Sequence, residues 1–419
     1  MRSNRTRHHW HPGSALLDTP VTEPSSMLTA NVLRRTLGGG LLTGLRCLGT
    51  ALSVMAAPYG SAHAAVPAPA KSNWSEFGFA PSGGRYNLHE HILDITNVGG
   101  LKVLWSAQDS SFPFTAPAVV NGVVYSGTNA FDAATGKLLW ATNSGGLSPA
   151  ISKGTAYIDT QNGLCAYAAS SGTNRWCAEN NYLPDAPSGA AVVDGIVYFG
   201  SALGSVFAID AATGAELWSS PISADNAASS PAVANGVVYI NGDGLFAFDA
   251  KTGAQLWSSS ILKGTSSPAV VGGVVYCSGG VLAAFDAKTG AVLWSESPGG
   301  PSSILGDSPA VAKNLVYIGA SVPGQHGSFS GMLYALNAKT GKTIWSAPMA
   351  SGITSSPTVA NGVVYIGSDD GTLYAFNAKT GAELATVAGV AGQSSPTVAN
   401  GMVYSETTVS GELFALGAQ

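Results

Sequence analysis

Residues Asp286–Trp294 read DAKTGAVLW, and this nine-residue phrase recurs along the chain with few changes. The other copies are DAATGKLLW at 132–140, DAATGAELW at 210–218, DAKTGAQLW at 249–257 and NAKTGKTIW at 337–345. An Asp side chain accepts hydrogen bonds from amides just downstream, and Gly readily adopts a positive φ, so the first half of the phrase predicts a turn. The second half, which ends in Trp, predicts a short strand.

A second phrase precedes each copy of the first, and its clearest form is SSPAVANGVVYI at 229–240. Its variants repeat a Tyr at intervals of 32, 41, 41, 37, 41, 48 and 39 residues, which gives Tyr125, Tyr157, Tyr198, Tyr239, Tyr276, Tyr317, Tyr365 and Tyr404. A period of about 40 residues with strand-like content is typical of propeller blades.

Each repeat divides into four short strands. SPAV and VVYI flank an Asn-Gly turn, which suits a two-residue hairpin because Asn and Gly tolerate positive φ angles. A third strand such as LYAF then leads through the D-x-x-T-G turn into the strand that ends in Trp. One such sheet buries too little surface to be stable alone, whereas neighbouring sheets bury one another. The sequence therefore predicts an all-β fold, an eight-bladed β-propeller of four-stranded antiparallel blades over residues 73–419.

A Trp closes the fourth strand of six repeats, at Trp140, Trp176, Trp218, Trp257, Trp294 and Trp345. A buried indole removes about 150–250 Å² from water, which stabilises the fold by about 4–6 kcal/mol before entropic losses. Because the same position is filled in six repeats, we expect these rings to pack across neighbouring blades rather than to form a ligand platform.

The last repeat ends at GELFALGAQ (411–419) and lacks a fourth strand. GGLKVLW at 99–105 resembles that strand and stands before the first repeat. We therefore expect the N-terminal strand to complete the last blade, which would remove the exposed edge of an open ring.

The N-terminal region has the features of a secretory leader. Arg34 and Arg35 precede apolar segments, and Ala62-His63-Ala64 matches a small-x-small cleavage pattern. We expect residues 1–64 to be a leader that is cleaved after Ala64, with Met27 as an alternative start and residues 65–72 as a linker. The Arg pair also allows twin-arginine export. The protein is then periplasmic, displayed at the cell surface or secreted.

Composition narrows the classes of partner. From Ala65 onward the chain has 13 basic and 22 acidic residues, and they form no basic stripe, so a nucleic-acid partner is not expected. No apolar run long enough to span a bilayer occurs outside the leader. We expect a monomer with no membrane span in the mature chain.

The longer loops indicate where a ligand would bind. The connections between second and third strands, and those between blades, lie on one face and vary in length, and loops on a rigid scaffold commonly form binding sites. The side chains that we expect on this face are Tyr182, Asp185, Gln325, His326 and Phe329. Loops that are solvated and bind no ligand are the alternative interpretation.

Cys165 lies on a third strand, and Cys177 follows Trp176 on the adjoining fourth strand. The turn between these strands places the two residues almost opposite each other, close enough for a disulfide in an oxidising compartment. Two separate buried thiols remain the alternative. Cys277 is expected to be a small core residue.

These repeats resemble the pyrroloquinoline quinone (PQQ)-type propeller family. That family includes quinoprotein alcohol and glucose dehydrogenases and the propeller lipoprotein of the bacterial outer-membrane barrel-assembly machinery. The stretch at 73–105, with Trp74, Arg85-Tyr86, Asn97-Val98 and Leu101–Trp105, is similar to the opening of the dehydrogenases. The resemblance implies a propeller fold, but the repeat alone does not imply an activity.

The enzymes of that family place two adjacent cysteines against PQQ, bind Ca²⁺ through clustered acidic and Asn ligands and use an Asp base. No adjacent cysteines occur in this chain. Asp369, Asp370 and Asp243 are the candidates for Ca²⁺ ligands, and each is also explained as a turn residue. His89 and His91 form an H-x-H pair without a third ligand. We therefore expect no catalytic, cofactor or metal residues.

The sequence favours an exported, non-catalytic propeller that binds or scaffolds a protein or small ligand in the cell envelope or extracellular space. A PQQ-dependent oxidoreductase with Ca²⁺ is the alternative, supported by the N-terminal stretch. A carbohydrate-binding surface protein is a third possibility, although most aromatic residues are expected to pack between blades.

Overall fold

The computed structural model describes residues 72–109, 116–142, 144–160, 163–178, 189–201, 204–222, 229–262, 264, 266–305, 308–324, 329–407 and 410–418. The predicted leader and all of the predicted linker except Ser72 lie outside these residues. In the described part of the chain, no helix is long and apolar enough to cross a lipid bilayer.

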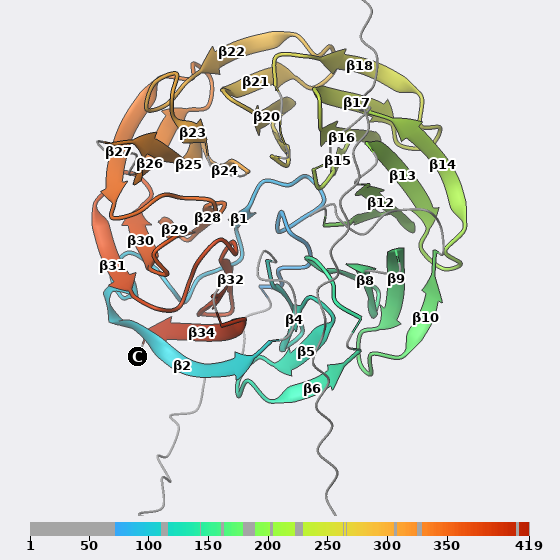
Figure 1. Ribbon diagram of the computed structural model, residues 1–419, viewed down its shortest axis with the longest axis horizontal. Helices are drawn as coiled ribbons and strands as arrows, with labels where there is room; N and C mark the ends of the chain where they lie inside the picture. Colours follow the sequence, from blue (N-terminus) through green and yellow to red (C-terminus); the bar gives the residue numbers. More distant parts are fainter. Residues whose placement is uncertain are drawn as a thin grey trace, which may run out of the picture. The chain divides into compact units, whose positions relative to one another are not determined.

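The described residues form eight sheets around a central axis, as Figure 1 shows. Seven blades follow one another in the chain, from blade 1 (β3–β6) to blade 7 (β28–β31), and blade 8 contains β32–β34 together with β2. Neighbouring strands within each four-strand set are antiparallel. The all-β, eight-bladed architecture predicted from the repeat is confirmed.

The four strands recur in the same order in every blade, and this order runs from the axis outward. The innermost strands are β3 (Ala118–Val120), β7 (Ala150–Ser152), β11 (Ala191–Val193), β15 (Ala232–Ala234), β19 (Ala269–Val271), β24 (Ala310–Ala312), β28 (Thr358–Ala360) and β32 (Thr397–Ala399). The second strands are β4 (Val123–Ser126), β8 (Thr155–Thr160), β12 (Ile196–Gly200), β16 (Val237–Asn241), β20 (Val274–Ser278), β25 (Leu315–Pro323), β29 (Val363–Gly367) and β33 (Met402–Glu406).

The third strands are β5 (Asn129–Asp132), β9 (Gly163–Ala168), β13 (Ser205–Asp210), β17 (Leu245–Asp249), β21 (Leu282–Asp286), β26 (Phe329–Asn337), β30 (Leu373–Asn377) and β34 (Glu412–Ala418). The outer strands are β6 (Leu138–Ala141), β10 (Asn174–Cys177), β14 (Glu216–Pro221), β18 (Gln255–Ser259), β22 (Val292–Glu296), β27 (Thr343–Met349), β31 (Glu383–Val387) and β2 (Leu101–Gln108). Three short elements lie outside this scheme: β1 (Tyr86–Asn87), η1 (Val98–Gly100) and β23 (Ile304–Leu305).

The ring is closed by strands from opposite ends of the chain. β2 pairs antiparallel with β34, from Leu101 opposite Ala418 to Gln108 opposite Glu412. The sheet order is β2-β34-β33-β32, so the N-terminal strand is the outer strand of the last blade. This is the arrangement expected from the missing fourth strand of the last repeat.

Recurring Trp and Gly residues join neighbouring blades at every junction except the one between blades 7 and 8. The Trp257 indole donates a hydrogen bond to the Ala287 carbonyl of the following blade at 3.1 Å, and the Tyr239 hydroxyl donates to the same carbonyl at 3.0 Å. A Cβ on Gly290 would lie 2.7 Å from the Trp257 ring, so only glycine fits beneath the indole. The same indole contact is made by Trp105, Trp140, Trp176, Trp218, Trp294 and Trp345.

The two serines of the SSPAV phrase make different hydrogen bonds. Within blade 5, the Ser278 amide donates to Ser266 Oγ at 3.2 Å. Between blades, the Ser267 amide donates to Ser308 Oγ at 2.9 Å. Further links of the second kind join Ser230 to Ser267, Ser308 to Ser356 and Ser356 to Ser395. The first serine therefore fastens its own sheet, and the second fastens neighbouring sheets near the axis.

The junction between blades 7 and 8 departs from this pattern. Blade 8 has no D-x-x-T-G turn, and Ala385 occupies the β31 position that is Trp in blade 4. Tyr365 is fully buried, and its hydroxyl has no hydrogen-bond partner among the described residues. Leu93 and Val98 pack in the same cluster as Tyr365. The segment before β2 thus fills the space that a Trp fills elsewhere.

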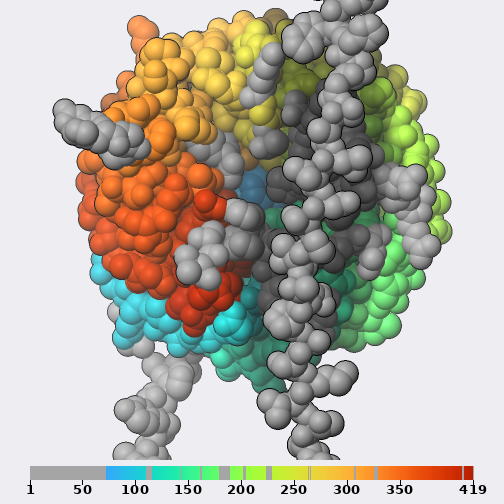
Figure 2. Space-filling model, viewed as in Figure 1, coloured from blue at the N-terminus to red at the C-terminus, as the bar shows by residue number. Residues whose placement is uncertain are grey.

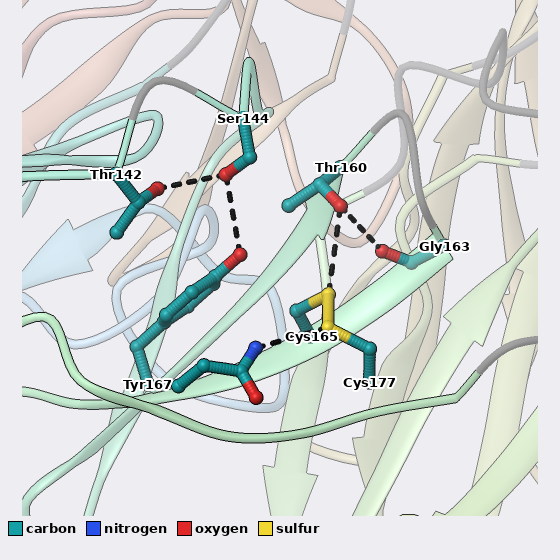
Figure 3. The surroundings of a disulfide bond; sticks show 8 residues. Thr142, Ser144, Thr160, Gly163, Cys165, Tyr167 and Cys177 are labelled. Atoms are coloured by element: carbon teal, nitrogen blue, oxygen red, sulfur yellow. Dashed lines mark hydrogen bonds between the residues drawn. A yellow bond between two sulfur atoms is a disulfide. The ribbon is translucent and has the colours of Figure 1, made fainter.

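Blade 2 also departs from the repeat, because Ala168 stands where blades 1 and 3 to 7 have Asp or Asn at the start of the turn. In blade 5 the Asp286 Oδ1 accepts hydrogen bonds from the Lys288 and Thr289 amides, which an alanine cannot do. A disulfide between Cys165 and Cys177 joins β9 and β10, the two strands on either side of this turn (Figure 3). This is the predicted disulfide. It links covalently the two strands of a hairpin whose turn has no Asp or Asn to accept these hydrogen bonds.

Candidate functional site

Residues 74–87, which we call the axis segment, run through the centre of the ring (Figure 1). Trp74 exchanges two backbone hydrogen bonds of 2.7 Å with Val119 of β3. The corresponding amides of other inner strands donate to successive carbonyls of the segment at 2.6–3.0 Å: Ile151 to Ser75, Val233 to Pro81, Val270 to Ser82, Val311 to Gly84 and Val359 to Arg85. In Figure 2 the blue atoms of the N-terminal part of the described chain are visible at the centre of the ring.

Blades 3 and 8 form hydrogen bonds with side chains of the axis segment. The Val192 amide of β11 donates to Glu76 Oε1 at 3.4 Å, and Asn87 Nδ2 donates to the Val398 carbonyl of β32 at 2.7 Å. Each blade therefore bonds to the axis segment through the middle residue of its inner strand. The axis is thus filled by residues of the chain itself.

Arg85 fastens the axis segment to blades 7 and 8. Its side chain is fully buried, and its Nε donates to the Pro357 carbonyl at 2.9 Å, while Nη2 donates to Thr358 Oγ1 at 2.9 Å. Nη1 donates to the Phe77 carbonyl at 2.7 Å, and the guanidinium lies 4.6 Å from the centre of the Phe77 ring. Backbone carbonyls and an aromatic face thus replace water around this cation.

Glu76 is a buried acid on the same segment. Its side chain is 5% exposed, and burial raises the pKa of its carboxyl to about 8, an effect that the hydrogen bond from Val192 partly offsets. A cavity of about 10 Å³, lined by Glu76, Ser230 and Ser267 among others, adjoins it. A cavity of this size has room for one water molecule. Because its pKa is about 8, the carboxyl group of Glu76 is mostly protonated at neutral pH.

The raised pKa of Glu76 predicts a stability that depends on pH. Between pH of about 4.5 and 8 the folded state holds a proton that the unfolded chain has released, so the free energy of unfolding falls as pH rises. Each unit of pKa difference contributes about 1.4 kcal/mol. We expect Glu76→Gln to flatten this slope, as measured by urea unfolding from pH 5 to pH 9.

Asp159 provides the control for this experiment. Burial raises its carboxyl pKa to about 7, so it contributes a slope of the same sign that ends about one pH unit below the slope from Glu76. Asp159→Asn should remove this contribution and leave the slope from Glu76, which extends to a pH of about 8. Parallel stability profiles for the parent and Glu76→Gln proteins would show that Glu76 is ionised in the folded state.

The loop face comprises the second-to-third-strand connections and the connections between blades. Of the predicted binding residues, Tyr182, Asp185, Gln325 and His326 lie outside the described residues, and Phe329 is described. Phe329 is 45% exposed and pairs with Pro323 at the end of the β25–β26 hairpin. Both strands of this hairpin have 9 residues, whereas the equivalent strands of blade 7 have 5.

A second exposed apolar side chain belongs to the same sheet. Ile304 of β23 is 59% exposed, and it pairs with Ser321 in the extended part of β25. Blade 6 therefore presents an isoleucine and a phenylalanine at its loop-face end, and we call these two residues the blade 6 patch. Ile304 was not predicted, because a two-residue strand inside a long connection leaves no repeat signal.

The opposite face, which we call the turn face, contains the Asn-Gly and D-x-x-T-G turns. A groove of about 490 Å³ lies there between blades 6 and 7. It is lined by Tyr86, Asp94, Ile95, Ala312, Lys313, Leu315, Tyr317, Val359, Asn361, Gly362, Asn377, Ala378, Lys379 and Thr380. The sequence pointed to the loop face, whereas this groove is on the other face.

The candidate Ca²⁺ ligands lie in two turns of different blades, Asp369 and Asp370 in blade 7 and Asp243 in blade 4. Asp369 Oδ1 accepts a hydrogen bond from Thr354 Oγ1 at 2.7 Å, and Asp370 Oδ1 accepts one from the Thr372 amide at 3.0 Å. Asp243 lies in the turn between β16 and β17. The part of the chain that the structure describes contains no group of three or more His, Cys, Asp or Glu able to hold a metal ion.

PQQ with Ca²⁺ would need such a ligand set and, by the family resemblance, adjacent cysteines. Cys165 and Cys177 are bonded across two strands, the Cys277 thiol is buried, and residues 74–87 fill the axis. The described residues therefore do not fit this cofactor.

Comparisons with known proteins agree with this architecture. A family model described as outer membrane protein assembly factor BamB matches residues 100–240 and 226–419. The dehydrogenase subunit of a quinone alcohol dehydrogenase from Gluconobacter oxydans (strain 621H) is 32% identical over 154 residues, which are 35% of this chain and 17% of that protein. The match therefore spans less than one fifth of the length of this curated relative.

Two solved structures share the fold at low identity. Quinohemoprotein alcohol dehydrogenase from Comamonas testosteroni has a TM-score of 0.66 and 16% identity, covering 83% of this chain and 81% of the other. BamB from Moraxella catarrhalis has a TM-score of 0.59 and 20% identity, covering 76% of this chain and 99% of the other. Since the family model matches most of the propeller, the chain belongs to the family of the outer membrane protein assembly factor BamB.

Proposed function

We propose that this protein is an exported, non-catalytic propeller that acts as a monomer and binds a protein partner in the bacterial cell envelope. The leader of residues 1–64 would direct export, and the family description points to outer-membrane protein assembly as the setting. The observation that supports this most directly is the axis segment, because it occupies the centre of the ring and leaves the outer surfaces for binding.

The blade 6 patch is the surface that we assign to the partner. Phe329 and Ile304 are large, exposed and held on paired strands, so an interface can bury them without first ordering a loop. Exposed apolar side chains on a rigid support are typical centres of protein interfaces. Single exposed leucines also occur on outer strands of several blades. Leu256, which is 52% exposed, therefore serves as the control for the blade 6 patch.

Photo-crosslinking in the native envelope tests this assignment. A photoreactive residue at position 329 should form a covalent adduct with one partner, whereas the same residue at Thr340, in the turn between β26 and β27, should not. Phe329→Ala and Ile304→Ala should each raise the Kd for the purified partner about tenfold, as expected for residues at the centre of an interface. Leu256→Ala should leave the Kd unchanged. Adducts from Thr340 only, or an unchanged Kd in all variants, would contradict the assignment.

A PQQ-dependent oxidoreductase remains the second candidate, because curated relatives are quinone alcohol dehydrogenase subunits. PQQ and Ca²⁺ should be added to the purified protein while absorbance and dye reduction with alcohols or sugars are followed. We expect no saturable change. A saturable spectral change with turnover would replace the binding function by an oxidoreductase.

A further inference from the structure

The groove between blades 6 and 7 has an apolar interior. Tyr317 and Val359 are each 2% exposed, and half-buried Leu315 lies beside them. The Ala378 carbonyl in this region already has two partners, since it accepts from the Tyr317 hydroxyl at 2.9 Å and from the Trp345 indole at 3.2 Å. The interior therefore offers apolar contact area and little competing polar surface.

An extra wall, supplied by the N-terminal part of the chain, deepens this groove. Tyr86 of β1 pairs with Val359 of β28, and a Cβ on Gly362 would lie 3.7 Å from Ile95. The chain from Tyr86 to Ile95 therefore crosses the turn face beside blade 7. The volume of about 490 Å³ lies in the range of small-molecule pockets.

Two lysines contribute positive charge to the groove. Lys313 comes from the first turn of blade 6, and Lys379 comes from the second turn of blade 7. Both are exposed, and neither has an ion-pair partner among the described residues. No hydrogen bond engages the Tyr86 hydroxyl within that same part of the chain. Two ammonium groups and a phenol thus converge on the groove from three segments.

Asp94 is the acidic group of the groove, and part of its carboxylate is already used. Its Oδ1 accepts hydrogen bonds from the Thr96 amide at 2.7 Å and from Thr96 Oγ1 at 2.6 Å. The charged groups lining the groove are this carboxylate and the two lysines, so the balance is positive. An anionic group is therefore favoured at the lysines, and an apolar body is favoured against Tyr317 and Leu315.

We propose that the groove between blades 6 and 7 binds a small organic anion with an aromatic or aliphatic body. The anionic group would lie between Lys313 and Lys379, and the apolar body would lie on Tyr317, Leu315 and Val359. This site is on the turn face, so it goes beyond partner binding at the loop face and can be tested independently of it.

Anilinonaphthalene sulfonate (ANS) is a suitable probe, because it joins an aromatic body to one fixed negative charge. ANS fluorescence titration of the full chain should show one saturable site per molecule. A double variant that combines Lys313→Gln with Lys379→Gln should raise the Kd for ANS about tenfold, as expected for the loss of two exposed ion pairs with the sulfonate. N-phenylnaphthylamine, the same body without the sulfonate, should bind equally to the parent and to this double variant.

The repeat provides a matched control. Lys153 occupies the first turn of blade 2 at the position of Lys313, and Lys288 occupies the second turn of blade 5 at the position of Lys379. Lys153→Gln with Lys288→Gln removes the same charge and should leave the ANS Kd unchanged. The proposal is overturned if no saturable site is found, if the groove variant binds ANS like the parent, or if both double variants weaken ANS equally.

Discussion

Replacing Arg85 by alanine is expected to lower the free energy of unfolding by about 3–5 kcal/mol, since buried carbonyl groups lose their donor. The guanidinium bonds to Pro357 of blade 7, Pro396 of blade 8 and Phe77 of the axis segment. Losing it leaves these acceptors buried without a charged donor. Urea unfolding followed by tryptophan fluorescence measures the change.

Arg175 is the matched control for this substitution. It is exposed on β10, and its Nη2 donates to the Gly154 carbonyl at 3.4 Å. Arg175→Ala should change the free energy of unfolding by less than about 0.5 kcal/mol, as surface substitutions usually do. Arg85→Lys keeps the charge but not the planar, forked donor geometry, so it should lower the free energy of unfolding by an intermediate amount. Similar small losses at both arginines would show that the axis segment contributes little stability.

Deleting residues 98–106 is expected to abolish cooperative unfolding altogether. The deletion removes most of β2, so β34 becomes an exposed edge, and it removes Trp105, whose indole covers Gly136 of blade 1. Val98, which is fully buried between blades 7 and 8, is lost as well. Near-ultraviolet circular dichroism and tryptophan fluorescence should then give broad transitions that do not coincide.

Point substitutions separate ring closure from ordinary packing. Trp105→Ala and Trp257→Ala remove the same indole contact, the first where the chain ends meet and the second inside the ring. Each should destabilise the protein by about 3–5 kcal/mol while leaving a single transition. A truncated chain that melts in one transition at the midpoint of the parent would disprove the role of β2.

The repeat was enough to predict the blades, because each copy contains its own turn signals and its own apolar strands. The Trp of DAKTGAVLW could be assigned to packing from its recurrence alone, and its contact with the next blade confirms this. The closing strand could be predicted as well, since the last repeat lacked a part that residues 99–105 resemble. Local periodicity thus determined most of the fold.

The centre of the ring could not be predicted in this way. Residues 74–87 have no period, and their partners are set by the completed ring, as with Arg85 and Thr358, which are 273 residues apart. The groove on the turn face escaped prediction for a related reason, because four separate segments line it. The expectation for the loop face stays a prediction, with Phe329 as its one described residue.

The axis segment has a consequence for how the chain acquires its fold. It is synthesised ahead of every blade, yet its bonds reach from Val119 in blade 1 to Val398 in blade 8. Contacts between such distant residues form slowly, because a large loop must close before they are made. Arg85 and Asn87 therefore gain their partners in blades 7 and 8 only after these last blades have emerged. A ribosome that stalls before residue 397 would leave a product that no chaperone could bring to the native state.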